Sequence, residues 1–347
     1  MDFRLSDEQE LLVDTTRALL ANECDSTVVR AVAADPEAAR DLFDRHLREW
    51  VALAAPPPES SQVDLALFVI ECGAAVAPGP FLATAGLFAP LLAAAGHPLA
   101  GPATSGEITG TAAVAGADGV WQVNGDAVRT QVIDAHLVDH VAIVLPGPSL
   151  AVVPAAELER TDIQTLELAR TYSTVTVPEG LAGDPIAPDA LDDALERAAV
   201  AVAAELVGVA RWLVDTSVAY ARERVQFGRP IGSFQAIQHT LVDMALAHEE
   251  AAAAVAHAAM CIDADDADRH RAAHVAKAMA GLAARKASRD GLQVHGGIGY
   301  TWEHDLHLHL RRAFADDALC GTHEWHLDRL ADLLVAAAPG TGRTSQS

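Results

Sequence analysis

Three long stretches of helical periodicity in the second half of the chain constrain its fold most. They cover roughly residues 189–226, 233–262 and 266–295, and each repeats apolar residues at the spacing of one helix face. Helices of this length with short connections pack side by side in antiparallel bundles. The sequence therefore predicts a carboxyl-terminal helical bundle over residues 188–336, followed by a small, polar tail, 337–347, that we expect to be disordered.

The first hundred residues predict a second helical region. Ser6 and Gln9 have the spacing of a capping box, in which each side chain binds the backbone N–H of the other residue. Helical periodicity continues in three further segments, which proline clusters separate: 36–54, 61–76 and 81–95. We therefore expect an N-terminal helical domain over residues 1–100.

The amino-acid composition and its periodicity change between these two helical regions. Residues 101–187 contain short β-branched runs divided by glycine, aspartate and proline, and residues 124–125 are an Asn-Gly turn signal. The expected strands are 119–123, 136–145, 150–153 and 172–177. The predicted fold class is therefore mainly α with a small central antiparallel β domain.

Charge and cysteine content exclude several classes of function. The chain has 48 acidic and 24 Lys and Arg residues, a net charge of -24, which disfavours nucleic acid and anionic membrane surfaces as partners. Its 4 cysteines form no CxxC pair, and the charged first residues do not resemble a signal peptide. We expect a cytoplasmic protein with reduced thiols, without a membrane-spanning segment.

The segment 221–235 is the most informative motif. A long helix is expected to end near Phe227. Two glycines and a proline, at positions 228, 232 and 230, would then make a tight corner, and Ser233 would cap the next helix. Arg224 can form paired hydrogen bonds to a phosphate. Phe227 could cover a flat ring, and Gln235 could contact a polar ring edge. A simple helical corner would not require this set of side chains.

A glycine-rich turn follows the third long helix. Gly296, Gly297 and Gly299 come after Gln293 and let the backbone approach a ligand closely. It is not the dinucleotide-binding fingerprint, because no βαβ unit surrounds it.

Together the two segments resemble the acyl-CoA dehydrogenase family, which carries R-x-x-F-G-x-P-I…F-Q and Q-x-x-G-G-x-G segments at this separation. The resemblance implies a helical block, a β block and a C-terminal four-helix bundle. It also implies FAD at a subunit interface and α,β-dehydrogenation of acyl-CoA thioesters. The residues that match the family's cofactor contacts are Arg224, Gln226, Phe227, Gln235, Gln293, Gly296, Gly297 and Thr322.

The catalytic base of the family is missing from its usual place. The family's glutamate directly precedes Gly-Thr, and Cys320 occupies that position here. A free thiol has a pKa near 8.5, so it is mostly protonated at neutral pH and a poor base. Some members carry the base on the first long helix, at a position matched by Ala198. Glu196 points elsewhere, and Glu205 shares the face but lies about 10 Å along the axis, so it is the lesser alternative.

The segments that cradle the flavin ring in the family are also missing. Residues 104–109 and 129–131 stand where these segments should be and do not match them. The retained residues are those that the family donates to a neighbouring subunit's FAD, whereas the lost ones serve a subunit's own site. We therefore predict a subunit that lacks a base and completes the FAD site of a base-bearing partner, as α2β2, in an enzyme for which steroid-derived acyl-CoA is a candidate substrate.

Three other functions stay open at this point. One is a self-sufficient homo-oligomeric dehydrogenase with a displaced base. Another is a flavin monooxygenase on the same fold, although such a protein must hold reduced flavin itself. The third is a scaffold protein without flavin. A metal site is not expected, since His304, His307, His323 and His326 have no accompanying HExxH or Cys/His set.

Overall fold

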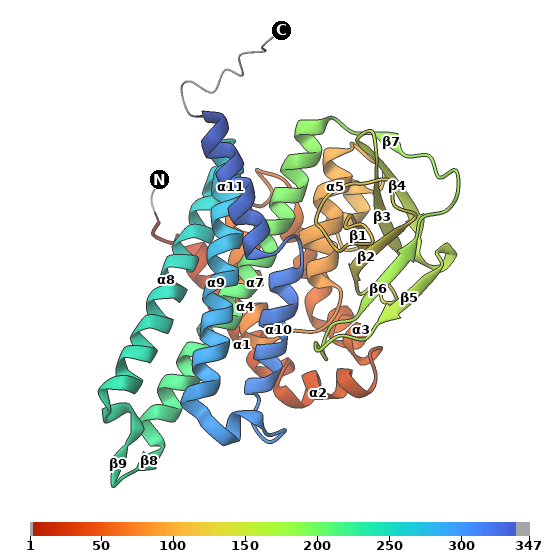
Figure 1. Ribbon diagram of the computed structural model, residues 1–347. Helices are drawn as coiled ribbons and strands as arrows, with labels where there is room; N and C mark the ends of the chain where they lie inside the picture. The colour runs from red at the N-terminus through yellow and green to blue at the C-terminus, as the bar shows by residue number, and fades with distance from the viewer. Residues whose placement is uncertain (1–2, 338–347) are drawn as a thin grey trace.

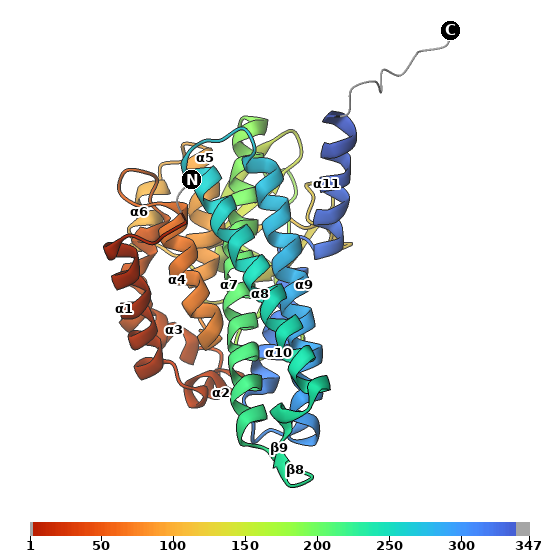
Figure 2. The same cartoon turned by 90° about the vertical axis from the view of Figure 1, so that its left-hand side faces the viewer.

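The long helices of the second half form the centre of the molecule. The computed structural model describes residues 3–337. Four helices run alongside one another as a bundle (Figures 1 and 2): α7 (Pro188–Glu223), α8 (Gln235–Asp263), α9 (Arg269–His295) and α10 (Leu306–Ala318). α11 (His323–Ala337) packs against α9. The predicted bundle is confirmed, and residues 338–347 of the predicted tail lie outside the described residues.

The N-terminal helices pack beside α7, with α4 between α7 and α1 (Figure 2). The predicted capping box is present, with Gln9 N–H bound to Ser6 Oγ at 3.2 Å and Ser6 N–H bound to Gln9 Oε1 at 3.1 Å. The helices are α1 (Asp7–Glu23), α2 (Ser26–Ala34), α3 (Ala38–Leu42), α4 (Gln62–Ala75), α5 (Ala89–Ala94) and α6 (Ala100–Thr104).

Two of the predicted N-terminal helices are broken into shorter pieces. In place of a continuous helix over 36–54, α3 is followed by a π-helical turn, Phe43–Leu47, and a 3-10 helix, Arg48–Ala54. In place of one helix over 81–95, a π-helical segment, Leu82–Phe88, precedes α5. Pro90, near the start of α5, cannot donate a backbone hydrogen bond, so the helical ladder is interrupted there. None of the helices in the described part of the chain is long and apolar enough to cross a membrane.

Two glycines allow α4 and α7 to approach closely. A Cβ atom on Gly208 of α7 would lie 1.9 Å from the backbone oxygen of Ile70, and one on Gly73 of α4 would lie 2.1 Å from the backbone oxygen of Glu205. A side chain at either position would collide with backbone, which cannot move aside. The contact therefore fixes how deep the middle of α7 lies in the core.

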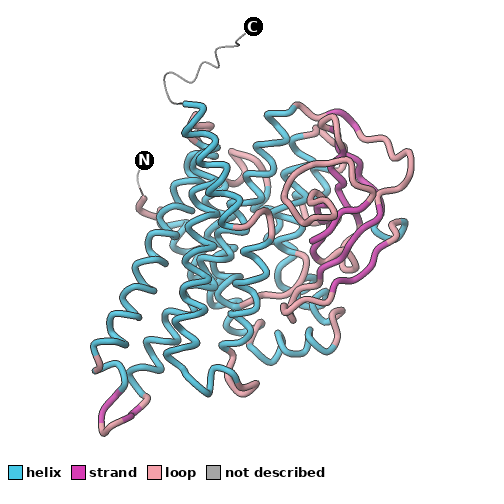
Figure 3. The backbone as a smooth tube through the Cα atoms, viewed as in Figure 1, coloured by secondary structure: helices cyan, strands magenta, loops and turns pink. Residues whose placement is uncertain are grey.

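Strands β1 to β7 gather on one side of the helical body and form two small sheets (Figure 3). One sheet has the order β1 (Gly110–Ala113), β3 (His140–Leu145), β4 (Ser149–Pro154) and β7 (Asp184–Pro185); the other has the order β2 (Val128–Ile133), β6 (Tyr172–Thr176) and β5 (Arg160–Ile163). The prediction of a purely antiparallel domain is wrong, because β1 pairs with β3 in parallel. The other pairs in these sheets are antiparallel.

The predicted strand at 119–123 is also wrong, because these residues form a loop. Local side-chain hydrogen bonds hold this loop in place of a strand ladder. The Asp126 carboxylate accepts from Ala117 N–H and from the Asn124 amide, and the Gln131 amide donates to the carbonyl of Gly119. The loop therefore turns its residues toward the helices instead of extending a sheet.

Candidate functional site

The corner between α7 and α8 is a hairpin that projects from one end of the bundle (Figure 1). It consists of β8 (Val225–Gln226) and β9 (Arg229–Pro230), with Phe227 at its tip, 93% exposed and at a φ of +51°. The predicted corner is present, but α7 ends at Glu223, earlier than expected. The predicted cap is wrong, because the Ser233 hydroxyl donates to the carbonyl of Pro230 and Phe234 occupies the N-cap of α8.

The side chains that match the family's nucleotide contacts are exposed on this hairpin and the adjoining turn. Arg224, Gln226 and Gln235 are all exposed. The side chain of Arg224 forms no hydrogen bond or ion pair with another residue between 3 and 337, although its backbone N–H and carbonyl are bonded to Tyr220 and Ile231. A free guanidinium beside an exposed phenyl ring suits a phosphate and a flat ring held outside this chain's own fold.

The glycine-rich turn lies at the same end of the bundle. The ring of Tyr220, near the end of α7, stacks on His295, the last residue of α9, with centroids 4.5 Å apart. Gly296 ends α9 with a φ of +59°, and Gln293 and Gly297 are exposed. Both motifs that carry the family resemblance therefore form one surface at one end of the molecule.

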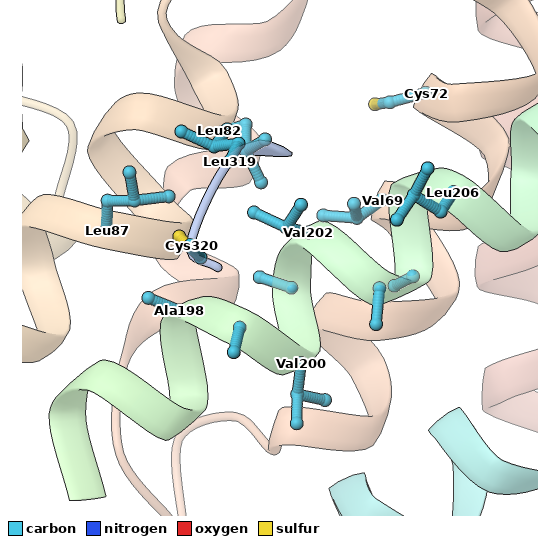
Figure 4. Packing of buried hydrophobic residues seen from close by; sticks show 14 of the residues in the cluster. Val69, Cys72, Leu82, Leu87, Ala198, Val200, Val202, Leu206, Leu319 and Cys320 are labelled. Atoms are coloured by element: carbon cyan, nitrogen blue, oxygen red, sulfur yellow. The ribbon is translucent and has the colours of Figure 1, made fainter. Parts of the chain in front are cut away.

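The position of the family's base is closed. Cys320 is fully buried, and burial raises the pKa of its thiol to about 12, so it is protonated at neutral pH. The ammonium group of Lys277 donates to the carbonyl oxygens of Asp317 and Gly321 and anchors this segment. Ala198 belongs to the same buried hydrophobic cluster as Cys320 (Figure 4). Both positions at which the resemblance to the family implies a base therefore carry small, buried side chains without a charge.

Glu205 is held in a buried ion network rather than left free as a base. Arg170 donates to both of its carboxylate oxygens at 2.9 Å, and Arg312 donates to one of them at 2.7 Å. Burial alone would raise the pKa of Glu205, but the two guanidinium groups outweigh it and lower the pKa to about 2. A carboxylate that is this weakly basic and this fully bonded is poorly suited to remove a proton.

Thr322 and Glu196 also have partners within the chain. The hydroxyl oxygen of Thr322 accepts from the backbone N–H of Trp325 at 3.2 Å, at the start of α11. The carboxylate of Glu196 lies 2.7 Å from Nδ1 of His270 on α9. Thr322 is half-buried and directly precedes α11, which lies far from β8 and β9 in Figure 1, so the structure does not bring it together with the predicted cofactor residues of the hairpin.

A cleft of about 430 Å³ between the β domain and α10 contains the second ring-side segment. Thr130 and Gln131 line it together with Glu167, Tyr172 and Ala318. Gln131 Oε1, Glu167 Oε2 and the Tyr172 hydroxyl have no hydrogen-bond partner among the described residues. Two of these three atoms can only accept, and one belongs to a carboxyl group. A flavin ring presents mainly acceptors, so this cleft does not fit it well.

The ring-side segments offer no flat wall to this cleft. Arg129, the first residue of the second segment, is buried in the β domain and donates to the carbonyl oxygens of Asn124 and Val144. Thr109, at the end of the other segment, is bonded to the Asp139 carboxylate at 2.8 Å. Both side chains therefore have their partners within this chain.

One group of side chains with possible metal-binding geometry was not anticipated from the sequence. Potential ligand atoms of Asp317, His323 and Glu324 lie within 4.8 Å of one another. Arg285 already binds the Asp317 carboxylate at 3.1 Å and supplies positive charge there. His304, another histidine that the sequence predicts not to bind a metal, accepts a hydrogen bond from the backbone N–H of Leu306. The absence of a metal site stays a prediction.

Comparison with known proteins establishes the family. The chain is 33% identical over 334 residues to the acyl-CoA dehydrogenase IpdE2 of Mycobacterium tuberculosis, covering 93% of this chain and 96% of that protein. The chain belongs to the acyl-CoA dehydrogenase family. The family model described as "Acyl-CoA dehydrogenase, C-terminal domain" matches residues 189–335, which include the bundle and α11.

Solved structures share the fold of this acyl-CoA dehydrogenase over nearly its whole length. The Tcur3481-Tcur3483 steroid dehydrogenase variant has a TM-score of 0.86 at 25% identity, covering 96% of this chain and 99% of that chain. The ChsE4-ChsE5 complex from M. tuberculosis has a TM-score of 0.83 at 22% identity, covering 98% and 100%. A glutaryl-CoA dehydrogenase of M. smegmatis, in complex with FADH2, has a TM-score of 0.81 at 16% identity, covering 96% of both chains. FAD is thus the cofactor found within the family.

Proposed function

We propose that this chain is a subunit of a heteromeric FAD-dependent acyl-CoA dehydrogenase that completes the flavin site of a base-bearing partner, as α2β2. The assembled enzyme would perform α,β-dehydrogenation of acyl-CoA thioesters. The similarity to steroid-type heteromeric dehydrogenases supports a bulky, steroid-derived acyl group. The observation that carries the proposal is the contrast between the two halves of the site. Arg224, Phe227 and Gln235 on the nucleotide side are exposed, while Cys320 and Ala198 at the two base positions are buried and uncharged.

Within such an assembly the roles of this chain's residues follow from their chemistry. The guanidinium of Arg224 would pair with the pyrophosphate, and Phe227 would cover a ring of the cofactor. The backbone at Gly296 and Gly297 would allow close approach of the ligand. The bound FAD accepts hydride from the substrate, and the partner would supply the base and the ring-side contacts.

Three observations count against the three other functions. A self-sufficient dehydrogenase with a displaced base would need Glu205 or a neighbour to be free, but Glu205 is bonded to two arginines. A monooxygenase would need its own ring site, but two of the three unpartnered polar atoms in the cleft, Gln131 Oε1 and Glu167 Oε2, are acceptors, as are most polar atoms of a flavin ring. A scaffold without flavin would leave the exposed Arg224 and Phe227 unexplained.

The experiment is to purify the assembled complex with Arg224→Ala and to measure its bound FAD. A charge-assisted hydrogen bond contributes about 1.5–3 kcal/mol, so FAD affinity should fall by about ten- to a hundredfold. Arg222→Ala is the matched control, because Arg222 is an exposed arginine two residues earlier, in the last turn of α7. Full retention of FAD by the Arg224 variant would refute the assignment of the hairpin.

A second experiment locates the base. The proposed base of the partner is replaced, and the complex is assayed with a bulky acyl-CoA. Turnover should vanish, and the particle should hold fewer flavins than chains. Turnover that persists without the partner's base would show that this chain carries a base of its own.

A further inference from the structure

A second cavity, of about 590 Å³, lies between the loop that contains Trp121 and the helices α7, α9 and α11. Its volume is in the range of small-molecule sites. The indole side chains of Trp121 and Trp325 form part of its wall, together with Leu191 and Leu195 of α7. None of the residues that line this cavity belongs to the hairpin or to the cleft beside α10, so the cavity is separate from both of these regions.

The polar part of the wall includes a hydrogen-bonded pair of histidines, His274 of α9 and His326 of α11. Nε2 of His326 lies 2.9 Å from the backbone oxygen of Cys320, and because a carbonyl only accepts, this nitrogen carries a proton. Nδ1 of His326 lies 2.8 Å from Nδ1 of His274. Burial lowers the pKa of His326 well below its usual value and the pKa of His274 to about 4, so both rings are neutral at pH 7.

These contacts fix which nitrogens carry protons. A neutral His326 that is protonated on Nε2 must accept at Nδ1, so Nδ1 of His274 is the donor between the rings. The remaining nitrogen of His274, Nε2, is then unprotonated. His274 therefore presents a hydrogen-bond acceptor, oriented by His326, from a position in the cavity wall.

The charges around the cavity select against anions. Three acidic residues line it, namely Asp189, Asp192 and Glu196, against a single arginine, Arg329. Glu196 is engaged by His270, and the Arg329 guanidinium lies 5.6 Å from the centre of the Trp325 ring. A phosphate or carboxylate would be repelled here, whereas an uncharged apolar molecule would not.

We propose that this cavity binds an uncharged, mainly apolar ring compound whose hydroxyl group donates a hydrogen bond to Nε2 of His274. The indoles of Trp121 and Trp325 provide apolar surface for the rings, and the acceptor selects a hydroxyl over an ether. The site goes beyond the proposed dehydrogenase function, since it needs neither FAD nor a base.

The test is calorimetric titration of the purified protein with three probes of one ring system. 2-Naphthol can donate to His274, 2-methoxynaphthalene cannot, and 2-naphthoate is an anion. Loss of one net hydrogen bond weakens binding by about two- to tenfold, so 2-naphthol should bind that much more tightly than the ether. 2-Naphthoate should bind more weakly than both neutral compounds. Equal binding of 2-naphthol and its ether, or preferred binding of 2-naphthoate, would overturn the proposal.

Substitutions in the cavity wall test whether the probes bind in this cavity. His274→Phe keeps an aromatic ring but removes the acceptor, so it should abolish the preference for 2-naphthol while retaining the ether. Trp325→Ala should weaken binding of both neutral probes, and its control is Trp302→Ala, a tryptophan that is 62% exposed and outside the cavity. Unchanged binding in Trp325→Ala would show that the probes bind elsewhere. The comparison of probes on the unaltered protein decides the proposal even if His274→Phe does not fold.

Discussion

Replacement of Glu205 by glutamine separates a structural role of this carboxylate from a catalytic one. Glu205 accepts three hydrogen bonds from Arg170 and Arg312 at 2.7 to 2.9 Å. The amide of glutamine would turn an N–H donor toward one of these guanidinium groups. Removal of one partner from a buried ion pair costs about 3–5 kcal/mol, since it leaves an uncompensated buried charge.

The other members of the buried ion network reduce this loss of stability. Asp316 also binds Arg170, at 2.7 Å, and burial together with the charge of Glu205 raises the pKa of Asp316 well above its usual value. Asp316 is therefore the carboxyl of this pair that binds a proton more readily. Without the charge of Glu205 it can ionise and pair with Arg170 in its place. We therefore expect a loss near the lower end of the range, about 3 kcal/mol.

The assay is thermal and urea unfolding of Glu205→Gln beside the unaltered chain. With an unfolding entropy of about 2.1 cal/mol/K per residue over 347 residues, a loss of 3–5 kcal/mol lowers Tm by about 4 to 7 °C. Asp268→Asn is the control, because it removes the exposed pair with Arg271 and should cost under about 1 kcal/mol. A Glu205→Gln complex with unchanged Tm and no turnover would refute the structural role and make Glu205 the base.

Three further predictions concern packing, the thiol and pH. Gly208→Ala should destabilise the fold by about 1–3 kcal/mol or more in urea unfolding, since its methyl would lie 1.9 Å from the Ile70 oxygen, whereas Gly101→Ala, with open space around it, should not. Cys320→Ala should leave turnover of the complex unchanged and cost on the order of 1 kcal/mol, because the buried thiol only fills space; complete loss of turnover with FAD retained would contradict this. Burial lowers the pKa of His309 from 6.5 to about 4, so the unfolded chain binds the extra proton first and stability should fall as pH drops from about 6.5 to 4, by at most about 3 kcal/mol for this group. His309→Gln should flatten that part of the plot of Tm against pH, and an unchanged slope would show that His309 does not cause it.

Part of the site could be predicted because its signals are local. The corner motif and the glycine-rich turn are contiguous segments at the ends of long helices, so periodicity and turn residues place them without knowledge of packing. Antiparallel helices then bring the end of α9 beside the end of α7, where Tyr220 stacks on His295. The absence of a glutamate at position 320 is likewise visible in the sequence alone.

The local signals failed where a side chain had two competing partners. Residues 119–123 have the composition of a strand, but the Asp126 carboxylate and the Gln131 amide bind the backbone of the adjoining loop. Serine is a residue type that often caps helices, but the hydroxyl of Ser233 donates to the carbonyl of Pro230 instead. Short-range propensity does not decide between such alternatives, since each hydrogen bond is worth about as much as its competitor.

The sequence by itself determined the helical bundle, the central β region, the family resemblance and the retained nucleotide-side residues. Only the tertiary structure decided the roles and the protonation of the ionisable side chains. Glu205 meets Arg170 and Arg312 across 35 and 107 residues of sequence, and His274 meets His326 across 52. Whether a carboxylate is a base or an anchor, and which imidazole nitrogen carries a proton, depends on burial and on partners from other helices. Those quantities exist only once the chain is packed.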